Sequence, residues 1–419
     1  MDIICKKDLC TACGACKNIC AKDAISMLEH GALGYVYPVI DQDKCVDCGL
    51  CKKICPVNHV PQYNEPLLSV AAICKNDEDT KASASGGAAY SLGRYIIEEE
   101  HGVVYGCELV DYATIKHTRY STLIDLGRMR GSKYVQSDTG LIYRSVKEDL
   151  LGGLKVLFTG TPCQIAGLKG FLRKDYDNLY CVDLVCHGVP SQKLLRDDTK
   201  SMFTKCGKDI PDGLKTKFRS IISDKESCME ILFGNFVWNP RVGNCENIIP
   251  IKEQIFPNND YIAAFMYGLT FRENCYTCPY AQKQRVSDIT VADYWGLGKD
   301  TAIPDGLGVS LLLPSTDKGV WLFEKAKRYM NWELRHVDEA VRGNGQLMKP
   351  SSRPVERDSF IQEYEKQGGL AYIVPLKKYR RQSSFNIRRA KTFRKYSDSK
   401  YMLLLARIYY KLLSKLLQI

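Results

Sequence analysis

One cysteine pattern occurs twice near the N-terminus: CTACGACKNIC at residues 10–20 returns as CVDCGLCKKIC at residues 45–55. In each stretch the four cysteines are separated by two, two and three residues, and every cysteine of the first stretch has a counterpart in the second. A match at all of these positions indicates an internal repeat. The repeat therefore predicts a small module, at about residues 1–60, that is built from two similar halves.

This spacing is typical of chains that hold two cubane [4Fe-4S] clusters. Three thiolates that lie two residues apart can wrap one face of a cubane, and the fourth cysteine of each run then binds the other cluster. The pattern predicts an α+β ferredoxin-like 2x[4Fe-4S] module. The expected ligands are Cys10, Cys13, Cys16 and Cys55 for one cluster, and Cys45, Cys48, Cys51 and Cys20 for the other.

A glycine follows the second cysteine of each run, at Gly14 and Gly49, where the backbone must approach a cluster closely. The alternative interpretation is a pair of zinc sites. Zinc usually takes two ligand pairs separated by a longer loop, whereas here four cysteines fall within eleven residues. The spacing therefore favours iron–sulfur clusters.

The composition restricts where such a chain can work. Of the 419 residues, 45% are hydrophobic and 26% are charged, as in ordinary globular proteins. No apolar stretch follows Met1, and no uncharged run approaches the ~20 residues that span a bilayer, so we expect a cytoplasmic protein without a secretory signal. Cytosolic thiols stay reduced, so the nineteen cysteines indicate metal or redox chemistry rather than disulfides.

Beyond a proline-containing linker at residues 56–68, strand and helix signals alternate. This alternation predicts an α/β core at residues 68–205 and a more mixed domain at residues 206–350. We expect strands near 70–73, 103–105, 155–158, 180–186, 230–237 and 289–292, and helices after 87, 160 and 191 and near 318–331.

The junction Thr161-Pro162-Cys163-Gln164 follows one of these predicted strands. Thr161 as N-cap, Pro162 at the first helical position and Gln164 two residues later predict a capping box. A helix N-terminus should lower the pKa of Cys163, so that its thiolate binds a metal or attacks an electrophile. The alternative is an inert buried thiol.

Three further cysteines have a similar context. Cys186 ends a predicted strand, and Cys275 and Cys278 form a C-x2-C pair. With Cys163 they make four thiols, the number that a third cubane requires. The remaining cysteines are expected to be packing residues: Cys5, Cys74, Cys107, Cys181, Cys206, Cys228 and Cys245.

Nucleotide-binding signals are weak. No G-x-G-x-x-G motif follows a strand, and no G-x4-G-K-[ST] loop occurs, so neither a Rossmann-type site nor a phosphate loop is predicted. The backbone amides of Ser85-Gly86-Gly87, at the start of a predicted helix, could bind a phosphate, although such a triplet is more often a turn.

Several short motifs nevertheless occur in a fixed order, namely Ser85-Gly86-Gly87, Arg130-Gly131-Ser132-Lys133-Tyr134-Val135, Gly160-Thr161-Pro162-Cys163-Gln164, Cys186-His187-Gly188-Val189-Pro190-Ser191, Cys275-Tyr276-Thr277-Cys278-Pro279, Ser287-Asp288-Ile289-Thr290 and Asp293-Tyr294-Trp295-Gly296. Taken together, they resemble the coenzyme F-420 hydrogenase/dehydrogenase beta-subunit family, with a ferredoxin domain attached at the N-terminus. The resemblance covers about residues 68–350.

The resemblance implies an iron-sulfur flavin-dependent oxidoreductase with an α/β flavoprotein-type body that carries FAD. It implies that Cys163, Cys186, Cys275 and Cys278 hold a third [4Fe-4S] cluster. His187, next to one of these cysteines, would tune the cluster or contact the flavin. The residues expected at the flavin are Ser85, Gly86, Gly87, Arg130, Ser132, Lys133, Thr161, Gln164 and His187.

The expected partners follow from the same resemblance. Electrons would pass between a carrier protein such as ferredoxin, the clusters and FAD, and a hydride would move to or from a small-molecule substrate. Because the family also includes proteins from surface-polysaccharide gene clusters, the substrate could be a deazaflavin or a polysaccharide precursor. The alternative is a non-catalytic electron-transfer subunit that feeds a partner enzyme.

The net positive charge of the chain comes from its C-terminal tail. Residues 376–419 contain thirteen Lys or Arg residues and one acid, whereas the rest of the chain has 46 basic and 47 acidic residues. The apolar face of the predicted helix at 401–419 is broad, so we expect a basic amphipathic helix that contacts the inner membrane surface. The alternative is docking on the protein's own surface. No nucleic-acid partner is expected, because the charge is too confined.

Overall fold

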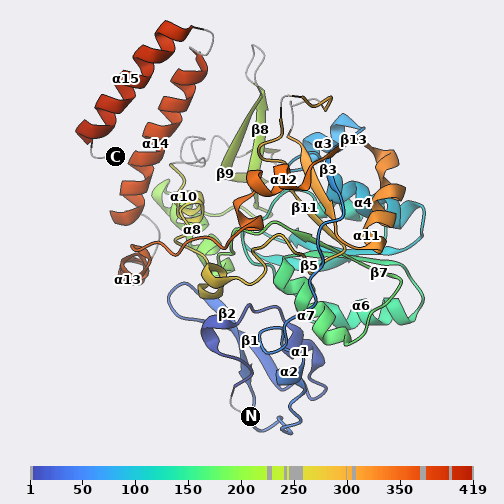
Figure 1. The fold of residues 1–419 in the computed structure, drawn as a ribbon. Coiled ribbons are helices and arrows are strands. Elements are labelled where there is room, and N and C mark those ends of the chain that lie inside the picture. The colour runs from blue at the N-terminus through green and yellow to red at the C-terminus, as the bar shows by residue number, and fades with distance from the viewer. Residues whose placement is uncertain are drawn as a thin grey trace.

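The computed structural model has three parts: an N-terminal module, a mixed α/β body above it, and a C-terminal pair of helices that projects from the body (Figure 1). Cys228 and Cys245 lie outside the described residues. The structure describes residues 3–223, 229–239, 243–244, 258–298, 300–303, 308–368, 374–395 and 399–417.

The N-terminal module contains an antiparallel hairpin of β1 (Ile25–His30) and β2 (Tyr35–Ile40) and two short helices, α1 (Ala15–Ile19) and α2 (Leu50–Lys53). The two helices follow Gly14 and Gly49, whose φ angles of +82° and +70° lie in the left-handed region that favours glycine. The two halves of the cysteine repeat therefore have the same local fold, as the sequence predicts.

One eight-stranded sheet forms the centre of the body. Its spatial order is β13-β3-β12-β11-β7-β6-β4-β5, with the pairs from β11 to β4 parallel and the others antiparallel. Strands from both sides of the predicted boundary at residue 205 join this single sheet. The strands are β3 (Ser69–Cys74), β4 (Val103–Leu109), β5 (Ile115–Tyr120), β6 (Val156–Gly160), β7 (Leu179–Leu184), β11 (Ile289–Asp293), β12 (Ser310–Pro314) and β13 (Met330–Arg335).

Helices cover both faces of the sheet because alternate strand residues point to opposite sides. From β6, Leu157 packs with α4 (Ala88–Glu98) and α11 (Asp317–Ala326) on one face. Val156 and Phe158 pack on the other face, in a core shared by α6, α7 and the N-terminal module. The bounds of these two helices are Ile142–Leu151 and Pro162–Leu172.

The predicted strands near 70–73, 103–105, 155–158, 180–186, 230–237 and 289–292 are present. The helix predicted near 318–331 is too long, because α11 ends at Ala326 and β13 begins at Met330. β13 pairs with β3 at the sheet edge, and most of its residues are only partly buried, so it lacks a clear apolar pattern. The sequence does not predict β5, whose stretch IKHTRY includes His117 among its buried positions.

Further elements surround this sheet. A second, antiparallel sheet is formed by β8 (Lys215–Ser223), β9 (Met229–Asn239) and β10 (Gly243–Asn244). The other helices of the described body are α3 (Asp77–Ala82), α5 (Leu123–Leu126), α8 (Gln192–Lys205), α10 (Asp260–Met266), α12 (Val337–Gly343) and α13 (Arg357–Gln367), with short 3-10 turns at Lys7–Leu9, Gly127–Met129, Glu273–Thr277, Lys327–Tyr329 and Gly345–Leu347.

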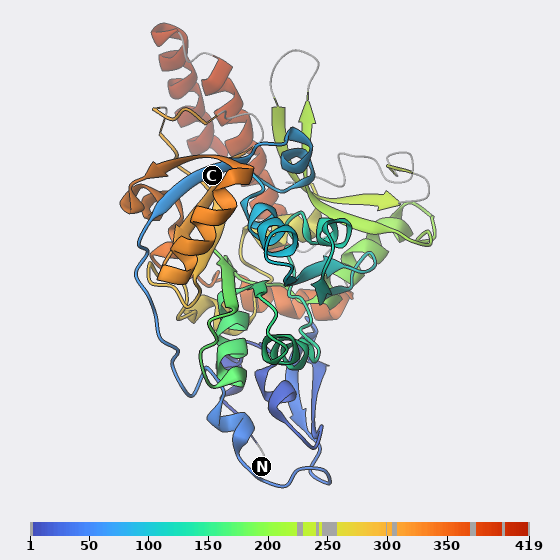
Figure 2. The ribbon, with the colours of Figure 1, turned by 90° about the vertical axis from the view of Figure 1, so that its right-hand side faces the viewer.

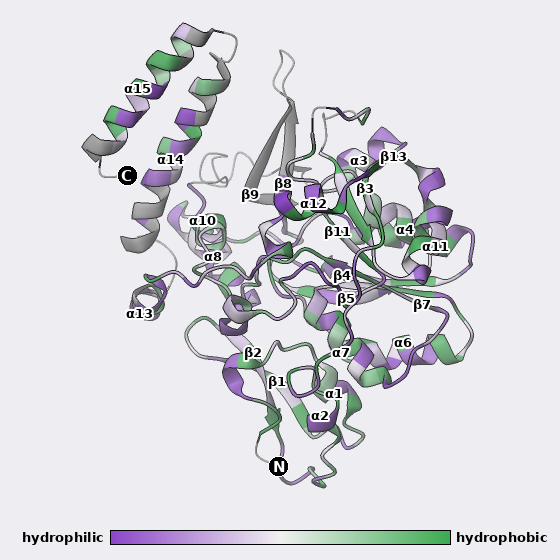
Figure 3. Cartoon of the chain, in the orientation of Figure 1, coloured by the Kyte–Doolittle hydropathy of each residue, from purple (hydrophilic) through white to green (hydrophobic). Residues whose placement is uncertain are grey.

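The C-terminal hairpin consists of α14 (Val374–Lys395) and α15 (Lys400–Leu417). Tyr410 of α15 faces α14, where its ring lies 5.5 Å from that of Phe385 and 5.8 Å from that of Phe393. Hydrophilic and hydrophobic residues alternate along α15 (Figure 3). Within the described residues, no helix is long and apolar enough to cross a bilayer.

The predicted linker at residues 56–68 runs up one side of the body to β3 (Figure 2). The backbone N–H and carbonyl of Asn64 both bond to Arg285, each over 2.8 Å, and the N–H of Leu67 donates to Pro314 O over 2.8 Å. The end of the linker that leads into β3 is therefore bound to the body.

Helix α7 packs directly on the N-terminal module. A Cβ atom at Gly167 would lie 2.8 Å from Sγ of Cys13, and one at Gly170 would strike the carbonyl of Ile54. Glycine at these two positions, one turn apart, allows the helix backbone to approach both halves of the cysteine repeat.

We expect Gly167→Ala to destabilise the protein by ~1–3 kcal/mol, because the added methyl group overpacks the contact with Cys13. The measurement is the urea midpoint of anaerobically purified full-length protein. Gly127→Ala is the control, since no atom lies within 4 Å of its Cβ position and its φ of −52° suits alanine. Equal midpoints for the two variants would show that α7 does not need this close approach.

Candidate functional site

The first cysteine cavity lies inside the N-terminal module. It is lined by Cys10, Cys13, Cys16 and Cys55, the four residues predicted to share one cluster, and we call them the inner set. All four are buried. The side chains thus converge as the repeat predicts.

Cys5, which we predicted to be a packing residue, lines the same cavity. A hydrogen bond from its thiol is the largest influence on two members of the inner set, and it lowers the pKa of Cys10 to about 6 and that of Cys55 to about 7. Cys5 stands outside the repeated spacing, so the sequence carried no signal for this position.

The outer set, Cys20, Cys45, Cys48 and Cys51, lies at the surface of the module. Cys48 is exposed and Cys51 is buried, whereas Cys20 and Cys45 are half-buried. Burial raises the pKa of Cys51, and negative charge on Cys48 and Cys20 raises it further. Cys20 of the first run therefore lies close enough to Cys51 of the second run to act on its charge, while the crossed ligand assignment stays a prediction.

A second cavity lies in the body and is lined by Cys163, Cys186, Cys275 and Cys278, which we call the body set. Cys163 is the second residue of α7, Cys186 follows the end of β7, and the other two belong to the turn after α10. Burial raises the pKa of Cys186 well above its ordinary value, and the charges of the other three thiols raise it further. Four thiols from three separate segments thus face one another.

The predicted capping box at the start of α7 is present. The Thr161 side chain accepts a hydrogen bond from the backbone N–H of Gln164. In return, Oε1 of the Gln164 side chain accepts a hydrogen bond from Thr161 N over 3.0 Å. The predicted lowering of the Cys163 pKa is wrong, because burial raises the pKa to about 11. The Thr161 hydroxyl, 3.1 Å from the sulfur, only partly opposes this rise, so a free nucleophilic thiolate is disfavoured.

The inner and body cavities adjoin. Thr11 lines both of them. Burial raises the pKa of Cys13 to about 12, and the neighbouring thiols that add to the rise include Cys163 of the body set. Tyr143 of α6 connects the two sides, since its hydroxyl lies 2.7 Å from Cys13 O and 2.9 Å from Gln164 O.

The three sets do not resemble a site for one ion. In the described part of the chain, no three His, Cys, Asp or Glu side chains are close enough together to hold a single metal ion. The four thiolates of a cubane bind four different irons, so they stand farther apart than the ligands of one ion.

A chain of hydrogen bonds leads from the body set to a buried histidine. Nε2 of Gln164 donates to Ser137 Oγ over 3.0 Å, and this hydroxyl lies 3.1 Å from Nδ1 of His117. The other ring nitrogen lies 3.1 Å from Thr159 O. Burial lowers the pKa of His117 to about 4, so the imidazole is neutral at pH 7. No motif in the sequence pointed to His117.

Most residues predicted at the flavin gather near one end of β3. Ser85 Oγ donates to Val309 O over 3.0 Å, and Arg130 pairs with Asp79 over 2.6 Å. Lys133 donates to two backbone carbonyls, and burial lowers its pKa. Gly86 and Gly87 lie against β3 and β12 beside Ser85. Thr161 and Gln164, by contrast, lie at the body set.

An ion pair lies near Ser85, because a Cβ atom at Gly308 would lie 3.1 Å from Ser85 Oγ and 3.5 Å from Arg219 Nη2. Arg219 Nη1 contacts both carboxylate oxygens of Asp293, each at 2.8 Å. Burial lowers the pKa of His187, and the charge of Asp293 opposes that shift. Ser132 hydrogen-bonds to Tyr134, whose pKa is raised to about 12 by burial and by Asp293. Arg219 and Asp293 were not selected from the sequence as site residues.

Arg285 holds the segment that follows Cys278. Its side chain is 2% exposed and pairs with Asp183, 0% exposed, over 3.1 Å. Nη1 also donates to Tyr280 O over 3.0 Å, and Nε donates to Thr290 Oγ1 over 2.8 Å. The buried pair therefore ties the C-x2-C turn to β7 and β11.

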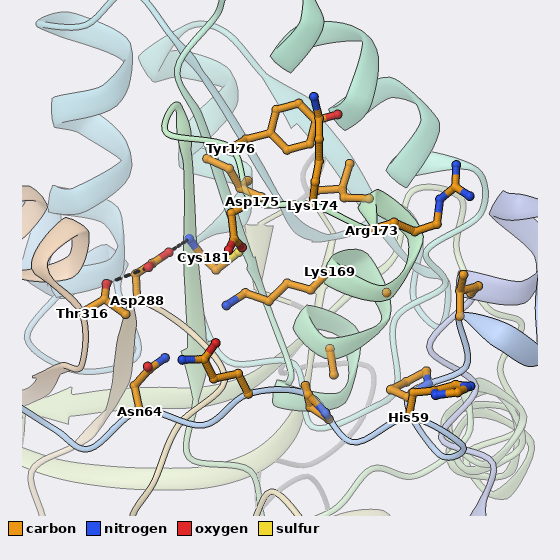
Figure 4. Close-up of a pocket in the computed structure, with 18 of the residues that line it drawn as sticks. His59, Asn64, Lys169, Arg173, Lys174, Asp175, Tyr176, Cys181, Asp288 and Thr316 are labelled. Atoms are coloured by element: carbon orange, nitrogen blue, oxygen red, sulfur yellow. Dashed lines mark hydrogen bonds between the residues drawn. The ribbon is translucent and has the colours of Figure 1, made fainter.

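A larger cavity than these two lies elsewhere, between α7, the linker and the start of α11 (Figure 4). None of the predicted site residues lines it. Asp288 accepts from Cys181 N over 2.7 Å and from the Thr316 hydroxyl over 2.7 Å, and Lys318 donates to two backbone carbonyls. These three polar side chains of the lining are thus occupied with contacts inside the protein.

The cysteine sets and the fold define an iron–sulfur protein with an N-terminal module joined to an α/β body. Residues 9–59 match the profile of the 4Fe-4S dicluster domain. Residues 153–340 match the family described as the C terminus of the beta subunit of coenzyme F420 hydrogenase/dehydrogenase. The resemblance noted in the sequence is confirmed over these residues.

Among solved structures, the chain is similar to a chain described as the F420-reducing [NiFe] hydrogenase complex from Methanosarcina barkeri, derivatized with xenon. The identity is 19% and the TM-score 0.40, with 78% of this chain and 94% of that chain covered. No curated protein sequence shows a significant match.

We expect Asp183→Asn to lower the free energy of unfolding by about 3–5 kcal/mol, because it leaves the Arg285 guanidinium buried without its counter-charge. Urea unfolding followed by tryptophan fluorescence measures the change. Asp358→Asn is the control, since its pair with Arg353 is exposed and should contribute little. Similar losses in both variants would contradict a special role for the buried pair.

Proposed function

We propose that the protein is an iron–sulfur flavoprotein oxidoreductase that passes electrons between a carrier protein and a small-molecule substrate. The observation that carries this proposal is the arrangement of the three cysteine sets. The outer set is at the surface, the inner set is buried, and the inner and body cavities share Thr11. Such a series suits transfer of single electrons from the surface into the body.

The donor sets fit [4Fe-4S] clusters. Each set supplies four thiols, and thiolates are the usual ligands of such clusters. The inner and body sets line closed-in cavities, where burial limits access of water. The outer set contains exposed Cys48, so the outer cluster is the one with which a carrier protein such as ferredoxin would exchange electrons.

FAD would supply the conversion between single electrons and hydride transfer. The residues that support a flavin site are Ser85–Gly87, Arg130, Ser132 and Lys133 near β3, with His187 beside Asp293. The Arg219–Asp293 pair adds charged groups next to them. The substrate class proposed is a deazaflavin, since the matched family is described by coenzyme F420 hydrogenase/dehydrogenase, or a surface-polysaccharide precursor, as the resemblance of the sequence implies.

Anaerobic reconstitution should load about twelve irons per chain, that is three cubanes of four irons, together with extractable flavin. Cys163→Ala should reduce the value to about eight, because it removes one ligand of the body set. Cys107→Ala, a half-buried cysteine outside the three sets, is the control and should retain the full content.

About eight irons in the unaltered protein would contradict the body cluster, and a flavin-free protein would contradict the flavin. Substrate turnover by the purified chain is the test of enzyme activity. Electron delivery that occurs only with a second protein would instead identify the non-catalytic electron-transfer subunit.

We further propose that the C-terminal hairpin contacts an anionic membrane surface. Ala406 and Tyr410 are buried toward α14, whereas the apolar side chains on the other faces of α15 are exposed. Exposed basic residues flank them, and each contributes roughly 1 kcal/mol to the free energy of binding near an anionic leaflet. The exposed apolar residues are Tyr401, Met402, Leu404, Leu405, Ile408, Tyr409 and Leu412.

The full-length protein should sediment with vesicles that contain anionic lipid, and the double substitution Leu404→Glu/Ile408→Glu should abolish this binding. Ile124→Glu is the matched control, because Ile124 is an exposed apolar residue of the body. Unaltered binding of the double variant would exclude α15 as the contact surface.

A further inference from the structure

Arg272 lies between the inner and body cavities. It immediately precedes the turn that carries Cys275, and it lines the body cavity. Its Nη2 donates to the carbonyl of Cys10 over 3.1 Å, and its Nη1 donates to Val36 O over 3.0 Å. One side chain therefore reaches from the body to the backbone of an inner-set cysteine.

This guanidinium is buried without a carboxylate. Arg272 is 1% exposed, and among the described residues no Asp or Glu oxygen lies within 4 Å of it. The other buried arginines of the described residues differ, since Arg219 pairs with Asp293 at 2.8 Å, Arg285 pairs with Asp183 at 3.1 Å, and Arg357 lies 3.5 Å from Glu273. An arginine keeps its charge in proteins, so burial without a counter-charge is strongly unfavourable.

The other contacts of Arg272 are neutral. The guanidinium lies 4.6 Å from the ring centre of Tyr37 and 5.4 Å from that of Tyr35, and Nη1 is 3.3 Å from Gln136 Oε1. Its Nε has no hydrogen-bond partner in the described part of the chain. Aromatic rings and carbonyls orient the group but do not cancel its charge.

We propose that Arg272 is the shared counter-ion of the two clusters held by the inner and body sets, and that it raises the reduction potential of both. This inference rests on the proposed function. A cubane with four thiolate ligands is an anion that gains one more negative charge on reduction, so a fixed neighbouring cation stabilises the reduced form more. Arg272 contacts no substrate in this proposal, and it acts by holding a fixed positive charge beside the two clusters.

The outer set has no such neighbour in the part of the chain that the structure describes. The hydrogen bonds of Arg272 go to Cys10 O, Val36 O and Gln136 Oε1, and its side chain lines the body cavity. None of these contacts involves a cysteine of the outer set. The outer cluster thus serves as an internal reference.

The test is a redox titration of the reconstituted full-length protein, followed by electron paramagnetic resonance. Arg272→Gln should shift the reduction equilibrium of two couples at least about tenfold toward the oxidised form, which is ~59 mV for one electron. The third couple, identified as the one lost in Cys48→Ala, should not move. Arg272→Lys keeps the charge and should retain most of the original potentials.

Arg144→Gln is the matched control. Arg144 also donates to a cysteine carbonyl, Cys20 O, over 2.8 Å, but it is partly exposed and pairs with Asp23 at 2.7 Å. Its substitution should leave the inner and body potentials unchanged. Unshifted potentials in Arg272→Gln, or equal shifts of all three couples, would overturn the proposal.

Gln136→Glu provides a second test if Arg272→Gln does not fold. The substitution is nearly isosteric and would place a carboxylate 3.3 Å from Arg272 Nη1. Neutralisation of the guanidinium should lower the same two potentials, and unchanged potentials would overturn the proposal. An iron content near eight in the unaltered protein would refute the body cluster of the proposed function, while the shift of the inner couple would still decide the role of Arg272.

Discussion

The contact between α7 and the first cysteine loop fixes the position of the N-terminal module on the body. The first turn of α7 carries Cys163 of the body set, and one turn later Gly167 brings the helix backbone against Cys13 of the inner set. Because helix and loop touch without an intervening side chain, the two cavities are neighbours. Tyr143 reinforces the contact through hydrogen bonds to carbonyls on both sides. The order of the three cysteine sets depends on this packing.

The turn that carries Cys275 and Cys278 contains little regular secondary structure, so buried arginines supply part of the hydrogen bonding that a helix or strand would provide. Arg285 donates to carbonyls after Cys278, and Arg357 donates to the carbonyls of Leu269 and Phe271 before Cys275. Arg272 donates across to the N-terminal module. Each arginine thus holds one side of the turn, but only Arg272 lacks a nearby carboxylate among the described residues.

Several features could not be predicted because they depend on contacts between distant segments. The pKa of Cys163 follows from burial under the module, which outweighs the local helix N-terminus. Cys5 joins the inner cavity although it lies outside the repeat, and Arg219 meets Asp293 only because β8 lies near the end of β11. The first two residues of the edge strand β13 lie within the helix predicted near 318–331, since a half-exposed strand lacks a clear period of two.

The sequence by itself determined the kind of module at the N-terminus, a 4Fe-4S domain, and it predicted how the ligands of that module are grouped. Eight cysteines in a repeated local spacing prescribe how a short loop wraps around a cluster, and this geometry involves few residues. It also determined the start of α7, because a capping box is a local interaction. Only the tertiary structure brought Cys163, Cys186, Cys275 and Cys278 to one cavity and placed Arg272 between it and the inner set. Those positions depend on strand order and helix packing, which no local spacing encodes.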